Sequence, residues 1–580
     1  MKALLTQRIL KSVWTCRLPR GLFHSHAGLL SSPIQAQYEA VRRGDQPLPE
    51  HFNFAGDVLD KWSQLEKEGK RPSTPALWWI NGSGGEVRWS FEELGVLSRK
   101  VANTLLDQCG LRKGDRIMVI LPRIPEWWLV TVACIRTGIV FIPGTTQLTA
   151  KDIQYRLQAS KAKCIITTDV LAPAVDSVVA SCSHLQSKLL VTKGKRDGWL
   201  NFNELLKEAP ADHTCEKTKT DDTMVVYFTS GTTGAPKMVE HSQGSLALRS
   251  VLHGRSWVNF TPSDTMWCTA DTGWVVAALE SMLDPWVCGS SVFVHSLPQV
   301  EPTTILNTLA RFPISVMFGA PTLFRMLVQK DLTSYKFANL QFCMSGGEPL
   351  NPEVLEQWKS KTGRSIYEIY GQTETGIICA VCRGMAVKPG SMGKACAPFD
   401  VQIIDENENV LPPGKEGEIA IRIKPERPLG LFSCYIDNLE KTAAVERGSF
   451  YVTGDRGIMD NEGYFWFTGR ADDVINSAGY RIGPFDVESA LLQHPAVAEA
   501  AAISSPDPIR GEVVKAFVVL SLGYASEDKE KLTLELQEHV KEVTAPYKYP
   551  RKVEFVQELP KTTTGKIRRN ELRSKEWGRV

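Results

Sequence analysis

A loop rich in hydroxyl groups and glycine occupies Thr229–Lys237, where the sequence reads Thr-Ser-Gly-Thr-Thr-Gly-Ala-Pro-Lys. It directly follows an apolar run typical of a buried strand. Glycine lets the backbone approach a phosphate closely, and N–H groups, hydroxyls and a cation can then bind that phosphate. The loop is not a Walker A loop, because Gly231 and Gly234 are too close together and Met238 replaces the magnesium-binding hydroxyl. The pattern indicates a phosphate-binding loop of another type.

Three further motifs combine ionisable side chains with glycine and threonine. They are Tyr370-Gly-Gln-Thr-Glu374, Tyr451-Val-Thr-Gly-Asp455 followed by Gly469-Arg470, and Pro560-Lys-Thr-Thr-Thr-Gly-Lys566. Each one alone also has a structural interpretation: a turn, a helix cap, a surface ion pair or an exposed lysine. Their combination and order therefore carry the functional interpretation.

The elements that must hold these motifs alternate between short β-branched runs and helical stretches. The pattern predicts a helix over Pro125–Thr137 and strands over Arg116–Leu121, Val140–Pro143, Cys164–Thr167, Leu189–Thr192 and Thr223–Phe228. Strands separated by helices indicate parallel or mixed sheets that are covered on both faces. The polar segment Ala211–Asp222 predicts a surface loop, and the proline-rich segment Lys424–Gly430 predicts a break in regular structure.

After about Gly469 the pattern changes to a compact α-β-β-α order. It predicts helices over Val487–Leu492 and Leu532–Val543, and strands over Val497–Ile503 and Val513–Leu520. Leu532, Leu536, Val540 and Val543 recur at helical spacing and predict a buried face. The predicted fold class is α/β: a large N-terminal domain of several subdomains with parallel or mixed sheets covered by helices, plus a small mobile α+β C-terminal domain.

Length and composition limit the class of protein. The 580 residues are too many for one ordinary core and imply two or more domains. The net charge of +2 argues against a nucleic-acid partner, which would require a strong basic excess. Thirteen cysteines are scattered along the chain, and Cys379 and Cys382 form a lone CxxC pair. The cysteines are therefore expected to be reduced, mostly buried thiols.

The N-terminal segment Met1–Tyr38 is basic and has no acidic residue before Glu39. This pattern is typical of a mitochondrial transit peptide, with a disordered basic tail as the alternative. No transmembrane helix is expected, because charged residues interrupt the best candidate, Ile117–Ile142, and a spanning helix needs about 20 nearly charge-free residues. The pair Trp127–Trp128 is expected to be buried in a large core.

The four motifs in this order resemble those of the adenylate-forming superfamily of acyl-CoA synthetases, peptide-synthetase adenylation domains and firefly-type luciferases. The resemblance covers Phe52–Trp577 and points in particular to the mitochondrial medium-chain acyl-CoA synthetases. It implies a transit peptide at 1–35, an AMP-binding domain at 36–471 and a mobile domain at 472–580. Further segments that support it are Leu121-Pro-Arg-Ile-Pro-Glu-Trp-Trp128, Asp271-Thr-Gly-Trp274, Ser477-Ala-Gly-Tyr-Arg-Ile-Gly-Pro484 and Ala545-Pro-Tyr-Lys-Tyr-Pro-Arg551.

The activity that the resemblance implies has two steps. A carboxylic acid and ATP form an acyl-adenylate and pyrophosphate, and CoA then gives acyl-CoA and AMP. The implied enzyme is a monomer of the mitochondrial matrix. Tyr370 would lie against the adenine, Asp455 would bind the ribose with help from Arg470, and Gly346–Glu348 would complete the pocket. The ATP-binding residues predicted in this way are Thr229, Ser230, Gly231, Thr232, Thr233, Gly234, Ala235, Pro236, Lys237, Glu368, Ile369, Tyr370, Gly371, Gln372, Thr373, Asp455, Arg470 and Lys566.

Thr373 and Lys566 are the predicted catalytic residues. By the resemblance, Thr373 contacts the substrate carboxylate and the α-phosphate, and Lys566 stabilises the negative charge that adenylation develops. Glu374 is placed to bind Mg²⁺, with Mn²⁺ as an alternative. The carboxylate nucleophile is already ionised at neutral pH, so no general base is needed. His241 is accordingly expected to have a structural or nucleotide-lining role.

The resemblance places CoA near the small domain after a rotation about Asp472. Guanidinium groups match phosphate geometry, although an exposed arginine is often only a solvated charge. The predicted CoA-binding residues are Gln147, Ala478, Gly479, Tyr480, Arg481, Arg510, Tyr549, Pro550 and Arg551.

The acyl pocket is predicted from Thr373, Trp274 and Gly371. Acetyl-CoA synthetases carry tryptophan where this chain has Gly371, so the resemblance favours acids from roughly butyrate to dodecanoate, with benzoate-type acids as an alternative. Two other functions stay open. One is an adenylating ligase with a different acceptor, such as a carrier protein or oxygen. The other is a nucleotide-binding module without catalysis. The complete set of hallmark residues argues against it.

Overall fold

The computed structural model describes residues 33–229, 236–297, 300–471, 473–477, 480–508, 510–561 and 566–578. Its contacts divide the chain into two units, Met1–Pro47 and Leu48–Val580. In the first unit the described part contains helix α2 (Pro33–Arg42), which is followed by a turn. Residues 1–32 of the predicted transit segment lie outside the described residues. All further elements belong to the second unit.

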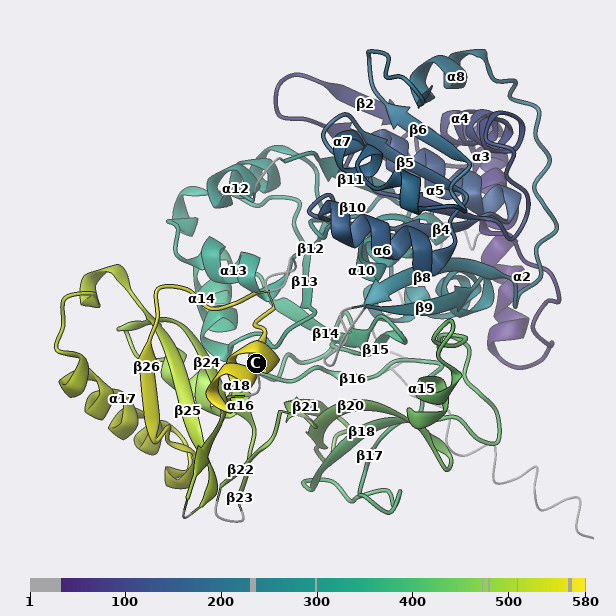
Figure 1. The fold of residues 1–580 in the computed structure, drawn as a ribbon. Coiled ribbons are helices and arrows are strands. Elements are labelled where there is room, and N and C mark those ends of the chain that lie inside the picture. The colour runs from purple at the N-terminus through teal and green to yellow at the C-terminus, as the bar shows by residue number, and fades with distance from the viewer. Residues whose placement is uncertain are drawn as a thin grey trace, which may run out of the picture. The chain divides into compact units, whose positions relative to one another are not determined.

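A seven-stranded sheet carries the predicted phosphate loop. Its neighbouring strands are parallel except for the last pair, β8 and β9, which is antiparallel. In spatial order the strands are β7 (Leu200–Asn201), β6 (Ser187–Val191), β5 (Cys164–Thr168), β3 (Arg116–Val119), β4 (Val140–Pro143), β8 (Thr223–Thr229) and β9 (Lys237–Ser242) (Figure 1). The five strands predicted here are confirmed, with bounds that differ by at most two residues at either end.

Helices follow the parallel strands, as the alternating pattern predicted. Helix α5 (Pro125–Thr137) begins with proline at its first turn and ends at Gly138 in the left-handed conformation, which explains its sharp bounds. Trp127 and Trp128 are buried in it, as expected. Helix α6 (Ala150–Ser160) has a capping box, because Thr149 and Asp152 each bond the other's backbone N–H.

A nine-stranded sheet carries the Tyr370–Glu374 motif. In spatial order its strands are β16 (Lys394–Ala395), β15 (Gly376–Ala380), β14 (Ile366–Gln372), β13 (Phe342–Gly346), β12 (Val316–Phe318), β10 (Thr265–Cys268), β11 (Ser291–His295), β1 (Leu77–Ile80) and β2 (Glu86–Trp89). The run from β14 to β1 is parallel, and β15, β16 and β2 are antiparallel to their neighbours. An apolar core under this sheet includes side chains of α12 (Pro302–Arg311), α13 (Pro321–Val328) and α14 (Pro352–Thr362).

A third, antiparallel sheet carries Asp455 and Arg470. It consists of β17 (Val401–Ile404), β18 (Glu416–Arg422), β20 (Phe450–Met459) and β19 (Glu446–Arg447), with β21 (Phe465–Arg470) paired to β20. The proline-rich segment Lys424–Gly430 contains no helix and almost no strand pairing, and α15 (Leu439–Ala444) follows it.

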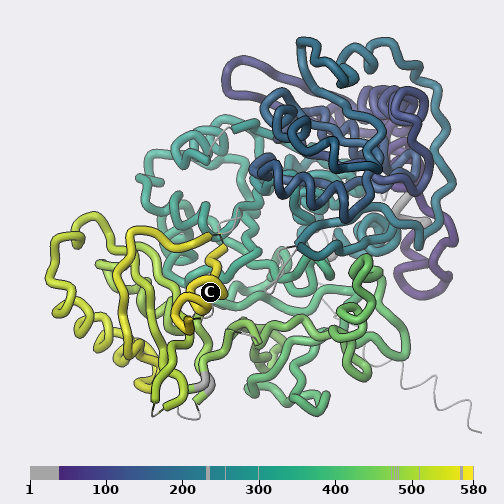
Figure 2. The backbone as a smooth tube through the Cα atoms, in the orientation of Figure 1, coloured from purple at the N-terminus to yellow at the C-terminus, as the bar shows by residue number. Residues whose placement is uncertain are grey.

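The last stretch forms a separate α+β domain with its own sheet, as predicted (Figure 2). The sheet contains β23 (Tyr480–Ile482), β22 (Ile475–Ser477), β25 (Gly511–Leu520), β24 (Val497–Asp507) and β26 (Lys552–Phe555). One of its faces packs against α16 (Pro484–Leu492) and α17 (Lys529–Val543), through Ala500 and Ala502 of β24. The other face packs against α18 (Arg569–Glu576), through Ala501 and Ile503. This alternation follows from the two-residue period of a strand.

The buried face predicted for α17 is confirmed for three of its four residues. Leu532, Leu536 and Val540 are buried in the core of the small domain. The prediction is wrong for Val543, which is 41% exposed. It is the last residue of the helix, and the following Thr544 has an extended backbone.

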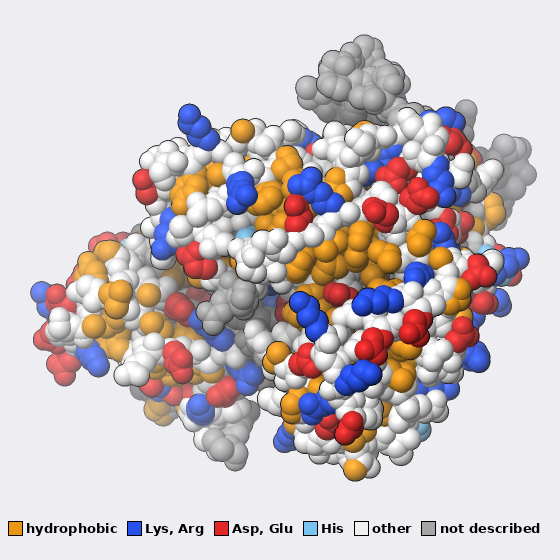
Figure 3. Space-filling model, turned by 90° about the horizontal axis from the view of Figure 1, so that it is seen from above, with side chains coloured by type: hydrophobic (Ala, Val, Ile, Leu, Met, Phe, Trp, Pro, Cys, Tyr) orange, Lys and Arg blue, Asp and Glu red, His pale blue; other side chains and the backbone are white. Residues whose placement is uncertain are grey.

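The surface and the cysteines agree with the composition. On the face shown in Figure 3, lysine and arginine side chains are interspersed with aspartate and glutamate. All described cysteines are free thiols, and most are buried. Among the described helices, none has both the length and the apolar character that crossing a membrane would require.

Candidate active site

The carboxylate of Asp455 is the centre of a hydrogen-bonded cluster. Asp455 is only 4% exposed. Its Oδ2 accepts hydrogen bonds from the Tyr370 hydroxyl at 2.6 Å and from Gln372 Nε2 at 2.8 Å. Its Oδ1 accepts one from Arg470 Nη1 at 2.8 Å. Since a buried carboxylate is tolerated only when it is paired and hydrogen-bonded, these three partners compensate Asp455 for its burial.

Three strands position this Asp455 cluster. Tyr370 and Gln372 lie at the end of β14, and β20 and β21 pair so that Asp455 stands opposite Arg470. Tyr451, also on β20, donates a hydrogen bond to Gln372 Oε1 at 3.2 Å. The structure thus brings together four predicted site residues from two different sheets.

The turn Thr373–Thr375 connects β14 to β15 and holds the two residues predicted to contact substrate and metal. The carbonyl oxygen of Thr373 accepts a hydrogen bond from His241 Nε2 at 2.6 Å. The carbonyl oxygen of Glu374 accepts one from the Phe432 N–H at 2.8 Å. Two outside segments therefore fix the backbone of the turn directly beside the Asp455 cluster.

His241 supports the turn and does not act as a base. Its side chain is fully buried on β9, and burial lowers its pKa to about 4. Because a carbonyl can only accept, the proton lies on Nε2, and Nδ1 accepts from the Ser245 hydroxyl at 3.1 Å. The imidazole is neutral at physiological pH, as the expected structural role requires.

Glu374 presents one free carboxylate oxygen. Its Oε1 accepts a hydrogen bond from the Tyr435 hydroxyl at 2.7 Å, and the structure gives Oε2 no hydrogen bond or ion pair with another described residue. No group of three His, Cys, Asp or Glu side chains in the described part of the chain could enclose a metal alone. Mg²⁺ commonly binds through one or two carboxylates plus substrate phosphates and water. A single glutamate beside the predicted nucleotide site fits that donor set.

The Thr229–Lys237 loop joins the antiparallel strands β8 and β9, whose end residues Thr229 and Lys237 are paired. A Walker A loop instead leads from a strand into a helix. The fold therefore agrees with the prediction that this loop is not a Walker A loop. Pro236 is fixed by a hydrogen bond from Tyr155 to its carbonyl at 3.1 Å. The predicted residues Ser230, Gly231, Thr232, Thr233, Gly234 and Ala235 lie outside the described residues.

Lys566, from the last predicted motif, lies within electrostatic range of this site. The protein atoms around its ammonium group lower its pKa, even though its side chain keeps an exposed surface. The carboxylates of Asp455, Glu348 and Glu374 act in the opposite direction, and the charge of Arg470 adds to the lowering. The predicted catalytic cation is therefore close enough to Asp455 and Glu374, the predicted ribose and metal ligands, for their charges to act on it.

Glu368 and Ile369 lie on β14 next to Gly346 of β13. Glu368 is buried, and desolvation raises its pKa to about 8. Its Oε1 accepts a hydrogen bond from the Leu350 N–H at 3.3 Å, and Oε2 has no partner among the described residues. Glu368 is thus a neutral carboxylic acid at pH 7, so it is better suited to line the nucleotide pocket than to bind a cation.

Gly371 is required by the backbone. The β14–β15 pairing shifts register between Tyr370 and Gly371. A Cβ at Gly371 would overlap the carbonyl oxygen of Gly376 and lie 2.7 Å from its carbonyl carbon. The sequence explained this glycine only by the size of the acyl group, whereas the structure adds a constraint from the opposite strand.

Trp274 and Gly273 lie on a segment that contacts the loop after β4. Trp274 precedes α10 (Val275–Ala278) and is partly exposed. A Cβ at Gly273 would lie 2.7 Å from the backbone nitrogen of Thr145. Asp271 joins the two segments by accepting a hydrogen bond from the Thr145 hydroxyl at 3.2 Å.

Most predicted CoA-binding residues gather at one end of the small domain. Tyr480 stacks on Tyr547, with ring centroids 4.4 Å apart. The Arg551 guanidinium lies 4.7 Å from the Tyr549 ring, and its Nη1 donates to the Tyr549 hydroxyl at 2.5 Å. Arg510 precedes Gly511, which pairs with Ser477 of the β22–β23 hairpin.

The other predicted CoA-binding residues give no further support to a site at this end of the domain. Pro550 is buried, and Gln147 is an exposed residue in the loop after β4. Ala478, Gly479 and the predicted hinge Asp472 lie outside the described residues, and only the backbone of Arg481 is described, in β23.

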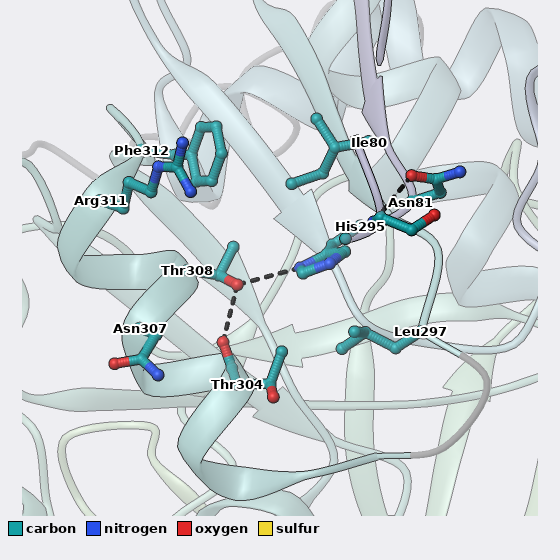
Figure 4. A pocket seen from close by; sticks show the side chains of 11 residues that line it. Ile80, Asn81, His295, Leu297, Thr304, Asn307, Thr308, Arg311 and Phe312 are labelled. Carbon is teal, nitrogen blue, oxygen red and sulfur yellow. Dashed lines mark hydrogen bonds between the residues drawn. The ribbon is translucent and has the colours of Figure 1, made fainter. Parts of the chain in front are cut away.

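A cavity of about 470 Å³ lies elsewhere, at the ends of β11 and β1 (Figure 4). In it, His295 Nδ1 donates to the Thr308 hydroxyl at 2.9 Å, and that hydroxyl donates to the Thr304 carbonyl. None of its lining residues belongs to the predicted site. The cavity is therefore separate from the Asp455 cluster.

The sequence missed two residues of the site. Tyr435 and Tyr451 bond Glu374 and Gln372, yet they are 61 and 79 positions away in the chain. Tyr451 was part of a recognised motif, and its place four residues before Asp455 on an alternating strand could have suggested a role. Nothing in the sequence around Tyr435 indicated its contact.

Replacing Glu368 by glutamine should make the protein more stable than wild type, by an amount that grows as the pH rises. The pKa of Glu368 is about 8 in the folded protein and near 4.5 when unfolded. Between these values the native state holds the extra proton, so this group makes wild-type stability fall with increasing pH. The Glu368→Gln variant should gain thermal stability over wild type from pH 5 to 8.5. An equal difference at every pH would contradict this, and Glu356→Gln on exposed α14 surface is the control.

Replacing Gly371 by alanine should destabilise the fold, because β14 and β15 must separate to admit the methyl group. The expected loss is at least about 2 kcal/mol, in the range for inserting a methyl into a packed core. The control is Gly523→Ala, where a Cβ would meet nothing within 4 Å. Thermal unfolding of both variants checks this, and equal midpoints would show that the bulge adapts.

Comparison with known proteins agrees with this site. The model of the family described as AMP-binding enzyme matches residues 65–436, and that of the AMP-binding enzyme C-terminal domain matches residues 486–566. The chain is 61% identical to the mitochondrial acyl-coenzyme A synthetase ACSM4 of Mus musculus, over 100% of both chains. It is 62% identical to the mitochondrial acyl-coenzyme A synthetase ACSM5 of Homo sapiens, over 94% of each.

Solved structures share the fold. A crystal structure of the anthranilate CoA ligase AuaEII in complex with anthranoyl-AMP is 28% identical, with a TM-score of 0.82, covering 92% of this chain and 98% of that one. A benzoate CoA ligase from Burkholderia xenovorans LB400 is 26% identical, with a TM-score of 0.77 and coverages of 90% and 100%. With both family models matched in order, and with Asp455 bonded to Tyr370 and Gln372 of the first matched region, the chain belongs to the AMP-binding enzyme family.

Proposed function

We propose that this chain is a mitochondrial medium-chain fatty acid–CoA ligase. In the first step the acid and ATP give an acyl-adenylate and pyrophosphate, and in the second CoA gives acyl-CoA and AMP. The observation that carries the proposal is the Asp455 cluster beside the fixed Thr373–Thr375 turn. The names of the 61–62% identical relatives, acyl-coenzyme A synthetases, support it, as does anthranoyl-AMP in a ligase of the same fold.

In this proposal the nucleotide binds through residues of two sheets. The Thr229–Lys237 loop takes the β- and γ-phosphates, Tyr370 faces the adenine, and Asp455 accepts the ribose hydroxyls with Arg470 beside it. An ionised acceptor makes strong bonds to hydroxyl groups. The substrate carboxylate is already charged at neutral pH, so the reaction needs no general base. The neutral His241 is therefore not required to accept a proton.

Mg²⁺ is the proposed metal, with Mn²⁺ as an alternative, and Glu374 is its proposed protein ligand. When bound with ATP, the ion would neutralise phosphate charge during adenylation. The free Oε2 of Glu374 supports this role. Thr373 is proposed to contact the carboxylate and the α-phosphate, and Lys566 the charge that develops in the transition state.

Lys566→Ala should reduce adenylation by about 10²–10³-fold, as loss of one such charge-stabilising group does. Thiolysis of supplied acyl-adenylate should fall much less, because that step develops no new charge on pyrophosphate. Single-turnover assays of each half-reaction measure this, with Lys575→Ala on exposed α18 surface as the control. Equal losses in both steps would refute the role given to Lys566.

The proposed acids run from roughly butyrate to dodecanoate, with a wall that includes Gly371 and Trp274. Each methylene buried in the pocket contributes about 0.8 kcal/mol, or roughly fourfold in kcat/KM, until the pocket ends. A panel of acids with ATP, Mg²⁺ and CoA, including benzoate, should show this rise and then a fall. A preference for benzoate would change the acid class, and no AMP or pyrophosphate with any acid would refute the activity.

CoA is proposed to bind at the hairpin end of the small domain, where Tyr480, Arg510, Tyr549 and Arg551 gather. The predicted domain bounds complete the proposal: a transit peptide at 1–35, an N-terminal domain at 36–471 and a mobile domain at 472–580 that rotates about Asp472. The mature protein is proposed to be a monomer in the mitochondrial matrix. Import into isolated mitochondria, with sequencing of the processed N-terminus, tests the first bound and the compartment.

A further inference from the structure

A short segment, Phe432–Ile436, links the predicted metal ligand to the end of the phosphate loop. It runs alongside β9, where Ser433 N–H donates to the Glu240 carbonyl at 2.7 Å and Ile436 N–H donates to the Met238 carbonyl at 2.9 Å. At its start, Phe432 N–H donates to the Glu374 carbonyl at 2.8 Å. The segment is therefore fixed by backbone hydrogen bonds to two parts of the site.

Tyr435 is the side chain of this segment that turns toward the site. It is 3% exposed, and its hydroxyl donates to Glu374 Oε1 at 2.7 Å. Its ring packs against the Phe432 ring, with centroids 4.8 Å apart. The Lys237 ammonium lies 5.2 Å from the centre of the Tyr435 ring, within the range of a cation–π contact.

We propose that Tyr435 is a positioning residue that orients Glu374 for the metal of the metal–ATP complex. The phenol occupies Oε1 and leaves Oε2 as the oxygen that can bind the ion. A glutamate has three rotatable side-chain bonds, so a fixed donor at one oxygen selects the conformation in which the other faces the nucleotide. The inference rests on the proposed function, because that proposal makes Glu374 the ligand.

The surroundings of Tyr435 hold its hydroxyl in one position relative to Glu374. Its backbone is held against β9, its ring is buried, and the turn that carries Glu374 is bonded to the same segment through Phe432. The backbone on both sides therefore holds the phenol within hydrogen-bonding reach of the Glu374 carboxylate. The same segment contacts both Lys237, through the Tyr435 ring, and Glu374, through the Tyr435 hydroxyl and the Phe432 N–H.

Tyr435→Phe is the sharp test, because it removes only the hydroxyl and keeps the ring beneath Lys237. The readout is Mn²⁺ binding, followed by electron paramagnetic resonance with a non-reacting α,β-methylene analogue of ATP. The dissociation constant for Mn²⁺ should rise about tenfold, which is typical for loss of a group that supports a metal ligand. In turnover assays the Mg²⁺ concentration for half activity should rise similarly, and excess Mg²⁺ should restore the rate.

Tyr464→Phe is the matched control, since that buried phenol donates to the Ala386 carbonyl at 2.9 Å and contacts neither Glu374 nor Lys237. It should leave Mn²⁺ binding unchanged. Glu374→Gln tests the metal ligand separately from the role of Tyr435. If it leaves Mn²⁺ binding intact, the metal ligand of the proposed function is wrong. If it abolishes binding while Tyr435→Phe binds Mn²⁺ like wild type, the role of Tyr435 is refuted and the ligand stands.

Discussion

A carboxylate that is almost fully buried requires compensation, and at Asp455 this requirement organises the site. Its partners come from β14 and β21, so satisfying one charge joins the nine-stranded sheet to the antiparallel sheet. Removing one partner of such a group leaves an uncompensated charge, which is costly in a protein interior. The end of β14 then sets the start of the Thr373–Thr375 turn. The anchoring of that one side chain, together with the hydrogen bonds from His241 and Phe432 to the turn, sets the positions of Thr373 and Glu374.

The ionisable residues around Asp455 differ in whether burial keeps them neutral. Burial keeps His241 and Glu368 neutral, although both lie next to the strands that form the site. The residues proposed to contact a phosphate, a ribose or a metal are Asp455, Arg470, Glu374 and Lys566. His241 and Glu368 therefore add no charge beside these residues at pH 7, and electrostatic stabilisation is strongest when the field is preorganised.

Much of the fold could be predicted from local sequence. Helix α5 and strand β4 have the predicted bounds, because Pro125 and Gly138 mark the helix ends and the strand is a short apolar run. The resemblance also assigned Asp455 and Arg470 to one site, and the structure pairs them. Contacts that depend on chain topology could not be predicted: Tyr435 meets Glu374, and His241 meets Thr373, only once separate elements have packed. The raised pKa of Glu368 likewise depends on burial, which its sequence neighbours do not reveal.

The bulge at Gly371 has a consequence for how chain-length preference can diverge within the family. The carbonyl oxygen of Gly376 fills the volume that any side chain at 371 would occupy. A tryptophan at this position would therefore require these two strands to pair differently. If Gly371 lines the acyl pocket as proposed, closing that pocket with a bulky residue changes the backbone as well as the side chain. An engineer who wishes to shorten the pocket at this position would have to rebuild the β14–turn–β15 unit.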